Sequence, residues 1–258
     1  MTVRTIFGAF LFVTLVTSCS TPSMRPFARV GYMHLDGDIT ASAGPVNAIV
    51  DVDSLGLGNG EAVPSLGADF EWDPLTVAVE GLVARYDWAG IAEADFSGQG
   101  QTITLGTPLE SQIDLGLYQA RATWDLMPSS PFDVGFGVGG GLIDYGISFD
   151  PTNVEPSIDI DENLPFGFLT ARVGRKFGDF ELLGLASGFG FDFGDEEIQF
   201  TEFQGSLIWS LWDMKAGSAA LELGYRYIEI DYEFDPSQGN FDVDATLDGF
   251  FVGASMRF

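Results

Sequence analysis

The sequence predicts an all-β chain that folds as an antiparallel up-and-down transmembrane β-barrel of about ten strands, with eight and twelve strands as alternatives. Three observations predict it. Apolar and polar residues alternate with a period of two in segment after segment, the connections are alternately short and long, and the long connections contain no basic residue. The composition agrees, because 46% of the 258 residues are hydrophobic and 33 are glycine.

The N-terminal segment, residues 1–18, is predicted to be a signal peptide. Arg4 precedes an apolar run, residues 6–16, that is too short to cross a bilayer as a helix. The sequence Val-Thr-Ser-Cys at 16–19 resembles the lipobox of bacterial lipoproteins, which implies cleavage before Cys19 and acylation of this residue. The alternative is a conventional signal peptide cleaved nearby. In either case residues 19–26 form a periplasmic tether and residues 27–258 form the barrel.

Ten strands are predicted from the alternation and from the turn-forming residues between segments. Compact turns are predicted at 73–74, 128–131, 178–179 and 213–218, and residues 46–52 and 101–105 are candidates for extra short strands inside loops. The predicted strands are 27–36, 65–72, 75–88, 111–126, 132–149, 165–177, 180–193, 200–212, 219–234 and 244–258.

The alternation is clearest in the last strand, where Phe250, Val252, Ala254, Met256 and Phe258 share one face. A soluble two-sheet sandwich would show the same pattern, and the connections and charges favour the membrane barrel. Two segments change phase, at 113–124 and at 225–232. We expect either a bulge at each of these points or strands that extend beyond the hydrocarbon layer.

Charged and aromatic residues separate along the strands. The long connections contain acidic residues and no Lys or Arg, whereas Arg25, Arg175, Lys176, Lys215 and Arg257 lie near the short ones. Aromatic side chains favour membrane surfaces, so we expect two girdles. The lower girdle comprises Trp72, Trp124, Trp209 and Trp212, and the upper one Tyr86, Trp88, Phe191, Phe193, Tyr232 and Phe234.

The chain ends in Ser255-Met256-Arg257-Phe258 after alternating apolar residues. This segment resembles the terminal-strand signal of bacterial outer-membrane β-barrel proteins, which closes on a C-terminal phenylalanine, here Phe258. The resemblance implies insertion by the barrel-assembly machinery, contact with outer-membrane lipid and lipopolysaccharide, and residence in the bacterial outer membrane. An even number of strands places both chain ends on the periplasmic side.

A set of charged residues points into the lumen if the apolar faces contact lipid. An unpaired ion in a narrow interior is costly, so these residues are expected to pair and to fill the barrel. The alternative is that they line a narrow solute or ion pathway. Gly135, Gly137, Gly139 and Gly141 leave space opposite long side chains in either case. The predicted network comprises Arg29, Glu80, Arg121, Arg172, Glu202, Glu222 and Arg226.

Composition excludes some functions and leaves two open. A net charge of −27 argues against a nucleic-acid partner, and the single histidine, His34, gives hydrolysis little support. No catalytic residue, metal site or cofactor is predicted. The leading hypothesis is a non-enzymatic outer-membrane barrel, structural or narrow and pore-like, with acidic extracellular loops. The alternative is a surface binding module whose acidic loops capture a host or partner surface or cations, with divalent cations as candidates at 51–53, 159–162 and 195–197.

Overall fold

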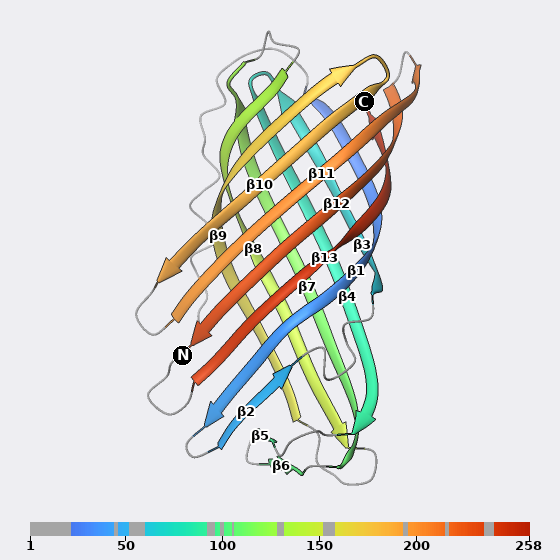
Figure 1. The fold of residues 1–258 in the computed structure, drawn as a ribbon. Helices are drawn as coiled ribbons and strands as arrows, with labels where there is room; N and C mark the ends of the chain where they lie inside the picture. Colours follow the sequence, from blue (N-terminus) through green and yellow to red (C-terminus); the bar gives the residue numbers. More distant parts are fainter. Residues whose placement is uncertain are drawn as a thin grey trace.

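The computed structural model describes residues 22–43, 46–51, 60–91, 96–98, 101–104, 106–127, 132–151, 158–192, 196–214, 217–234 and 240–258. Ten strands, each antiparallel to the next, form a closed barrel (Figure 1). The first strand pairs with the last, which completes the closure. The barrel strands are β1 (Ser23–Ala43), β3 (Glu61–Trp72), β4 (Leu75–Ile91), β7 (Pro108–Asp125), β8 (Phe132–Pro151), β9 (Ile158–Phe177), β10 (Phe180–Asp192), β11 (Glu196–Met214), β12 (Gly217–Phe234) and β13 (Asn240–Arg257).

The predicted all-β barrel of ten strands is confirmed, and most strands are longer than the alternation indicated. β9 begins at Ile158 rather than at residue 165, and β1 begins at Ser23, inside the predicted tether. Acidic residues are depleted in strands, so the acidic start of β9 resembles a loop in sequence. Of the short strands expected in loops, β2 (Val46–Asp51) pairs with β1, and β5 (Phe96–Gly98) pairs with β6 (Gln101–Ile103). Within the described ranges no helix is long and apolar enough to cross a membrane.

One end of the barrel carries the tight connections and both ends of the folded chain. The turns at Asp73-Pro74 and at Gly178-Asp179 lie there, and Met24 and Phe258 exchange backbone hydrogen bonds of 3.3 and 3.0 Å. We call this the turn end, which is uppermost in Figure 1, and the opposite end the loop end. In outer-membrane barrels short turns face the periplasm, so we assign the turn end to that side.

A belt of exposed apolar side chains surrounds the middle and the turn half of the barrel. In β13 Phe250, Val252, Met256 and Phe258 are between 47% and 69% exposed, whereas Phe251 on the opposite face is 3% exposed. Of the predicted lower girdle, Trp124, Trp209 and Trp212 are exposed at the turn-end side of this belt, whereas Trp72 is half-buried. We call the apolar surface the lipid belt; it includes Val30, Leu66, Val79, Val83, Phe136, Val138, Leu169, Val173, Leu182, Phe203, Leu207, Leu221 and Leu223.

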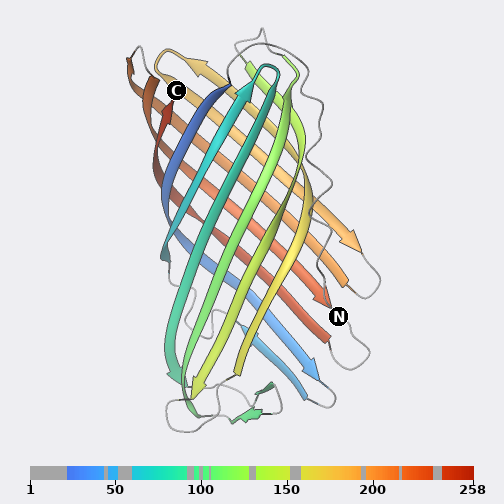
Figure 2. The ribbon, with the colours of Figure 1, turned by 180° about the vertical axis from the view of Figure 1, so that it is seen from behind.

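Toward the loop end the barrel opens into two facing sheets. The β3–β4 ladder stops at the pair Ser65 and Leu82, and the β9–β10 ladder stops at Leu169 and Gly188. Beyond these pairs one sheet contains β4, β7, β8 and β9, and the other contains β10 to β13, β1, β2 and the first residues of β3 (Figure 2). Two seams therefore separate the sheets in the loop half.

The polarity of the two faces is reversed in the loop half. Apolar side chains such as Leu117 point inward there, while Asp87 and Asp114 on the same sheet face outward. A two-sheet sandwich with an apolar interior is the arrangement of a water-soluble β-domain. We call the outward acidic set the acidic collar; it comprises Asp87, Asp114, Asp144, Asp231, Glu233 and Asp244.

This reversal explains the two phase changes in the sequence. Pairing of β7 with its neighbours is continuous through Ile113 and Tyr118, and pairing of β12 is continuous through Tyr225 and Ile228, so no bulge lies at either point. A register shift occurs elsewhere, between Ser210 and Trp212 of β11. The alternation continues, but the apolar residues move from the outer face to the inner one.

The prediction of an upper girdle at the membrane surface is wrong for two of its residues, which are buried, and a third residue also packs inward. Tyr86 is 1% exposed and Tyr232 is 8% exposed, and both face the interior. Trp88 packs against the same interior. Because the outer face is acidic in the loop half, these aromatic rings are buried between the sheets. Phe191, Phe193 and Phe234 have side chains outside the described set.

Candidate functional site: the filled lumen

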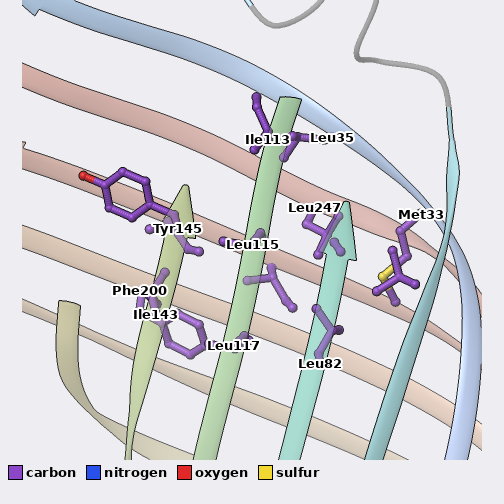
Figure 3. Close-up of a cluster of buried hydrophobic side chains, with 14 of the residues drawn as sticks. Met33, Leu35, Leu82, Ile113, Leu115, Leu117, Ile143, Tyr145, Phe200 and Leu247 are labelled. Atoms are coloured by element: carbon purple, nitrogen blue, oxygen red, sulfur yellow. The ribbon is translucent and has the colours of Figure 1, made fainter. Parts of the chain in front are cut away.

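The interior of the loop half is filled by an apolar core. Tyr86, Leu117 and Ile143 come from one sheet, and Met33 and Phe200 from the other, and all are at most 3% exposed. All five belong to one buried cluster, and Figure 3 shows Leu117, Ile143, Met33 and Phe200 within it. The hydroxyl of Tyr86 donates a hydrogen bond of 3.2 Å to the carbonyl oxygen of Met33, which links the two sheets. This core includes Leu35, Val63, Leu82, Ala84, Ile113, Leu115, Tyr145, Phe166, Phe168, Ile228, Ile230 and Leu247.

A layer of paired ions lies next to the apolar core, on its turn-end side. Glu80 accepts hydrogen bonds from Arg226 at 2.8 Å and from Arg29 at 3.1 Å. Arg29 also donates two hydrogen bonds to Glu222, at 2.9 and 3.1 Å, and the guanidinium of Arg226 lies 2.6 Å from Glu202. These residues reach one level from β1, β4, β11 and β12 because each occupies an inward position of its strand.

Two more residues complete the layer at its edge. Arg121 lies 4.0 Å from Glu80, and Gln119 donates a hydrogen bond of 3.4 Å to Glu202. With them the layer holds three guanidinium groups and three carboxylates, so its formal charge is zero. Burying ions is favourable only when each is paired in this way, since the desolvation penalty of an unpaired ion is several kcal/mol. We call this set the ion layer.

A wide vestibule opens at the turn end, on the far side of the ion layer from the apolar core. Its volume is about 860 Å³, and its walls carry separate ion pairs. Arg25 bonds to Asp69 at 2.7 Å, Arg172 to Asp133 at 2.9 Å, and Arg257 to Glu71 at 2.8 Å. The lumen therefore changes from a wet vestibule, through an ion layer, to an apolar core.

Lumen-facing glycines of β8 make room for aromatic rings of β9. A Cβ atom on Gly139 would lie 2.3 Å from the ring of Phe168, and one on Gly141 would lie 2.6 Å from the ring of Phe166. Phe166 and Phe168 are in turn within 5.7 Å of Phe200, measured between ring centroids. The space expected opposite these glycines is thus occupied by the core itself.

The structure brings together six of the seven residues of the predicted network. Arg172 is the exception, because it lies in the vestibule and pairs with Asp133. Phe258 ends the chain beside β1, and its exposed ring faces outward. Cys19 and the candidate cation ligands at 51–53, 159–162 and 195–197 lie outside the residues whose side chains are described. His34 is exposed on the outer face, edge-on to Tyr32 with 5.5 Å between ring centroids.

One solved outer-membrane protein shares this architecture. The outer membrane protease OmpT from Escherichia coli aligns over 93% of this chain and 99% of its own, with a TM-score of 0.51 and 9% sequence identity. The fold is that of a bacterial outer-membrane β-barrel. Ail of Yersinia pestis, solved with a heparin analogue, aligns over 91% of this chain and 99% of its own at a TM-score of 0.33 and 10% identity. AlkL in lipid bilayers aligns over 94% and 93% at a TM-score of 0.36 and 13% identity.

No protein-family model matches the chain, and no curated protein matches it in sequence. At these identities the likeness concerns the fold alone. The lipid belt of the outer-membrane barrel is an independent observation on this chain itself. In the closed half of the barrel the strand ladders pair the backbone groups, and the belt supplies the apolar surface. The protein therefore resides in the bacterial outer membrane.

The apolar core is the part of the barrel's interior that sequence reasoning missed. The signal was present in the phase changes, since Ile113, Leu115 and Leu117 share the strand face of Gln119 and Arg121. One continuous face that is polar in the turn half and apolar in the loop half indicates a lumen that changes character along its length.

Proposed function

We propose that this chain is a non-enzymatic outer-membrane barrel with a structural role, closed to solutes, that holds its acidic collar and acidic loops at the cell surface. The observation that supports this most strongly is that the lumen is filled at two successive levels. The ion layer crosses it at mid-height and the apolar core fills the loop half. A narrow conducting pathway would require both to move.

The position of the single histidine also supports a non-enzymatic role. His34 faces outward beside Tyr32, away from the lumen and its carboxylates. Replacing His34 by alanine is therefore expected to leave both the folded state and any envelope phenotype unchanged. Loss of a lipid- or peptide-hydrolysing activity in that variant would point to an enzyme instead.

Planar-bilayer recording tests the closed lumen directly. The refolded wild-type barrel is expected to insert without single-channel steps, beside a porin control that conducts. The matched variants are Glu80→Ala, which disturbs only the ion layer, and Asp87→Ala, which changes only the outer surface. Both are expected to stay silent, because the apolar core remains. Regular ohmic steps from the wild type would overturn the proposal and support the narrow pore.

The acidic collar favours a second candidate function, the capture of divalent cations or of a basic partner surface. Carboxylates dominate the outer face of the loop half, where Arg85 is the nearby base. Calcium titration of the barrel in proteoliposomes would distinguish specific capture of cations from a solvated acidic surface. Saturable binding that is lost when Asp231 and Glu233 become amides supports capture, whereas weak, salt-screened binding supports a solvated surface.

A further inference from the structure

The seam between β9 and β10 is a lateral gap in the barrel wall. The ladder joining these strands runs from Phe177 and Phe180 to Leu169 and Gly188 and stops there. β9 nevertheless stays paired with β8 up to residue 158, and β10 stays paired with β11 up to residue 192. The two strands therefore diverge while each remains ordered on its own sheet (Figure 2).

An apolar cavity of about 330 Å³ lies in this seam. Its floor is formed by Phe166 and Phe200, whose ring centroids are 4.6 Å apart. Phe189 lies on the same strand face as the buried Leu185, yet its side chain is 43% exposed. The lining residues are Pro165, Phe166, Gly167, Phe189, Ile198 and Phe200, and none of these side chains carries a polar atom.

The mouth of the cavity is continuous with the lipid belt. On β9, Leu169 is next to the mouth on the turn-end side and is 46% exposed. On the outer faces of neighbouring strands, Leu142 and Phe203 are 37% and 54% exposed. Gly167 stands at the mouth with no side chain to close it. Apolar surface thus runs without a break from the outside of the barrel into the cavity.

We propose that the seam cavity binds an acyl chain of an outer-membrane lipid, which enters sideways between β9 and β10. Its volume is within the usual range of ligand pockets, and every side chain in its lining is apolar. A charged or polar headgroup would find no partner among these side chains and would remain outside. This proposal is independent of whether the lumen conducts, because the cavity lies in the wall and not along the barrel axis.

Photolabelling in proteoliposomes tests the proposal. The full-length barrel is refolded in bilayers whose phospholipid carries a diazirine near the end of one acyl chain, irradiated, and mapped by mass spectrometry. Label is expected on the inward residues Phe189, Ile198 and Phe200, besides the label on the lipid belt. Label confined to belt residues such as Val173 and Leu182 would overturn the proposal, and the labelling map of the wild type is sufficient to distinguish the two outcomes.

A blocking variant and its matched control sharpen the test. In Gly167→Phe the new side chain closes the mouth, and its Cβ has only an ordinary contact, 3.8 Å from the oxygen of Gly139. Gly205→Phe places the same ring on the lipid belt, where a Cβ meets nothing within 4 Å. Labelling of Phe189 and Ile198 is expected to be lost in the first variant and kept in the second. Retention of this label in Gly167→Phe would contradict lateral entry.

A second labelling experiment identifies the source of the bound acyl chain. A photoreactive free fatty acid is added in solution to barrels in unlabelled bilayers. If the free acid labels the cavity but the membrane phospholipid does not, the bound species is a soluble hydrophobic molecule and the lipid proposal fails. Labelling by the phospholipid supports it.

Discussion

Glu80 occupies the centre of the lumen, where a single carboxylate faces three guanidinium groups. It bonds to Arg29 and Arg226 and lies 4.0 Å from Arg121. Its side chain is 1% exposed, so water screens these interactions poorly. The charge balance of the whole ion layer therefore depends on Glu80.

Replacing Glu80 by alanine is expected to lower the free energy of unfolding by about 3–5 kcal/mol, because it leaves excess positive charge in a buried layer. Urea unfolding followed by tryptophan fluorescence in lipid bilayers measures it. The control is Asp87→Ala, which removes an exposed partner of Arg85 and is expected to cost at most about 1 kcal/mol. Equal costs for the two variants would show that the ion layer is not specially stabilising.

Sequence reasoning could identify the members of this layer but not their partners. The alternation within each strand predicts that Arg29 and Glu222 both point inward, but it treats each strand on its own. Their pairing joins residues 193 positions apart, and it depends on the register of strands that meet only when the barrel closes. The sequence groups Arg172 with the ion layer for the same reason. The alternation shows which strand face it occupies, but not its position along the barrel axis.

At the scale of the strand, β7 shows how one element serves two environments. Its inward face carries Gln119 beside the ion layer and Leu117 in the apolar core, while its outward face carries Tyr118 and, further along, Asp114. The strand keeps a single alternation throughout. What changes along it is which face is apolar.

Opposite substitutions on β7 test this reversal. Leu117→Asp is expected to destabilise the barrel by about 3–5 kcal/mol or to prevent folding, because it buries a carboxylate in the apolar core. Asp114→Leu, three positions away on the outer face, is expected to change stability by at most about 1 kcal/mol. Heat-modifiable migration and urea unfolding report both. If Leu117→Asp is tolerated and Asp114→Leu is not, the assigned faces are reversed.

The seams had a sequence signal that pattern reasoning did not use. Proline cannot donate a ladder hydrogen bond, so inside a sheet it marks an edge. Pro64 directly precedes the end of the β3–β4 ladder at Ser65, and Pro165 lies beyond the end of the β9–β10 ladder at Leu169. Both prolines interrupt otherwise convincing strands. The alternation gave the number of strands, but only such breaks could indicate where neighbouring strands part.

At the scale of the whole molecule, closure depends on the contact between the first and last strands. β1 pairs with β13 from Phe27 to Ser42, and beyond that ladder Met24 and Phe258 bond to each other at the turn end. The ring of Phe258 is 61% exposed and is not needed to fill the interior. Its role is therefore expected to lie in assembly.

Replacing Phe258 by aspartate is expected to reduce the amount of heat-modifiable barrel in the outer membrane of cells, while the purified variant still refolds in detergent. The reason is that the exposed ring contributes little to packing but belongs to the segment expected to be read by the assembly machinery. Gel migration of unboiled samples from both preparations measures it. Parallel losses in cells and in detergent would mean that the ring matters for stability instead.

Because Met24 and Phe258 are joined by a pair of backbone hydrogen bonds, the first and last residues of the barrel lie side by side. Neighbouring termini of this kind allow circular permutation. A short linker would join the two residues and preserve the ladder, and a cut in a connection at the other end would then carry both new termini to the opposite face. The same fold would become an anchor for displaying a fused peptide.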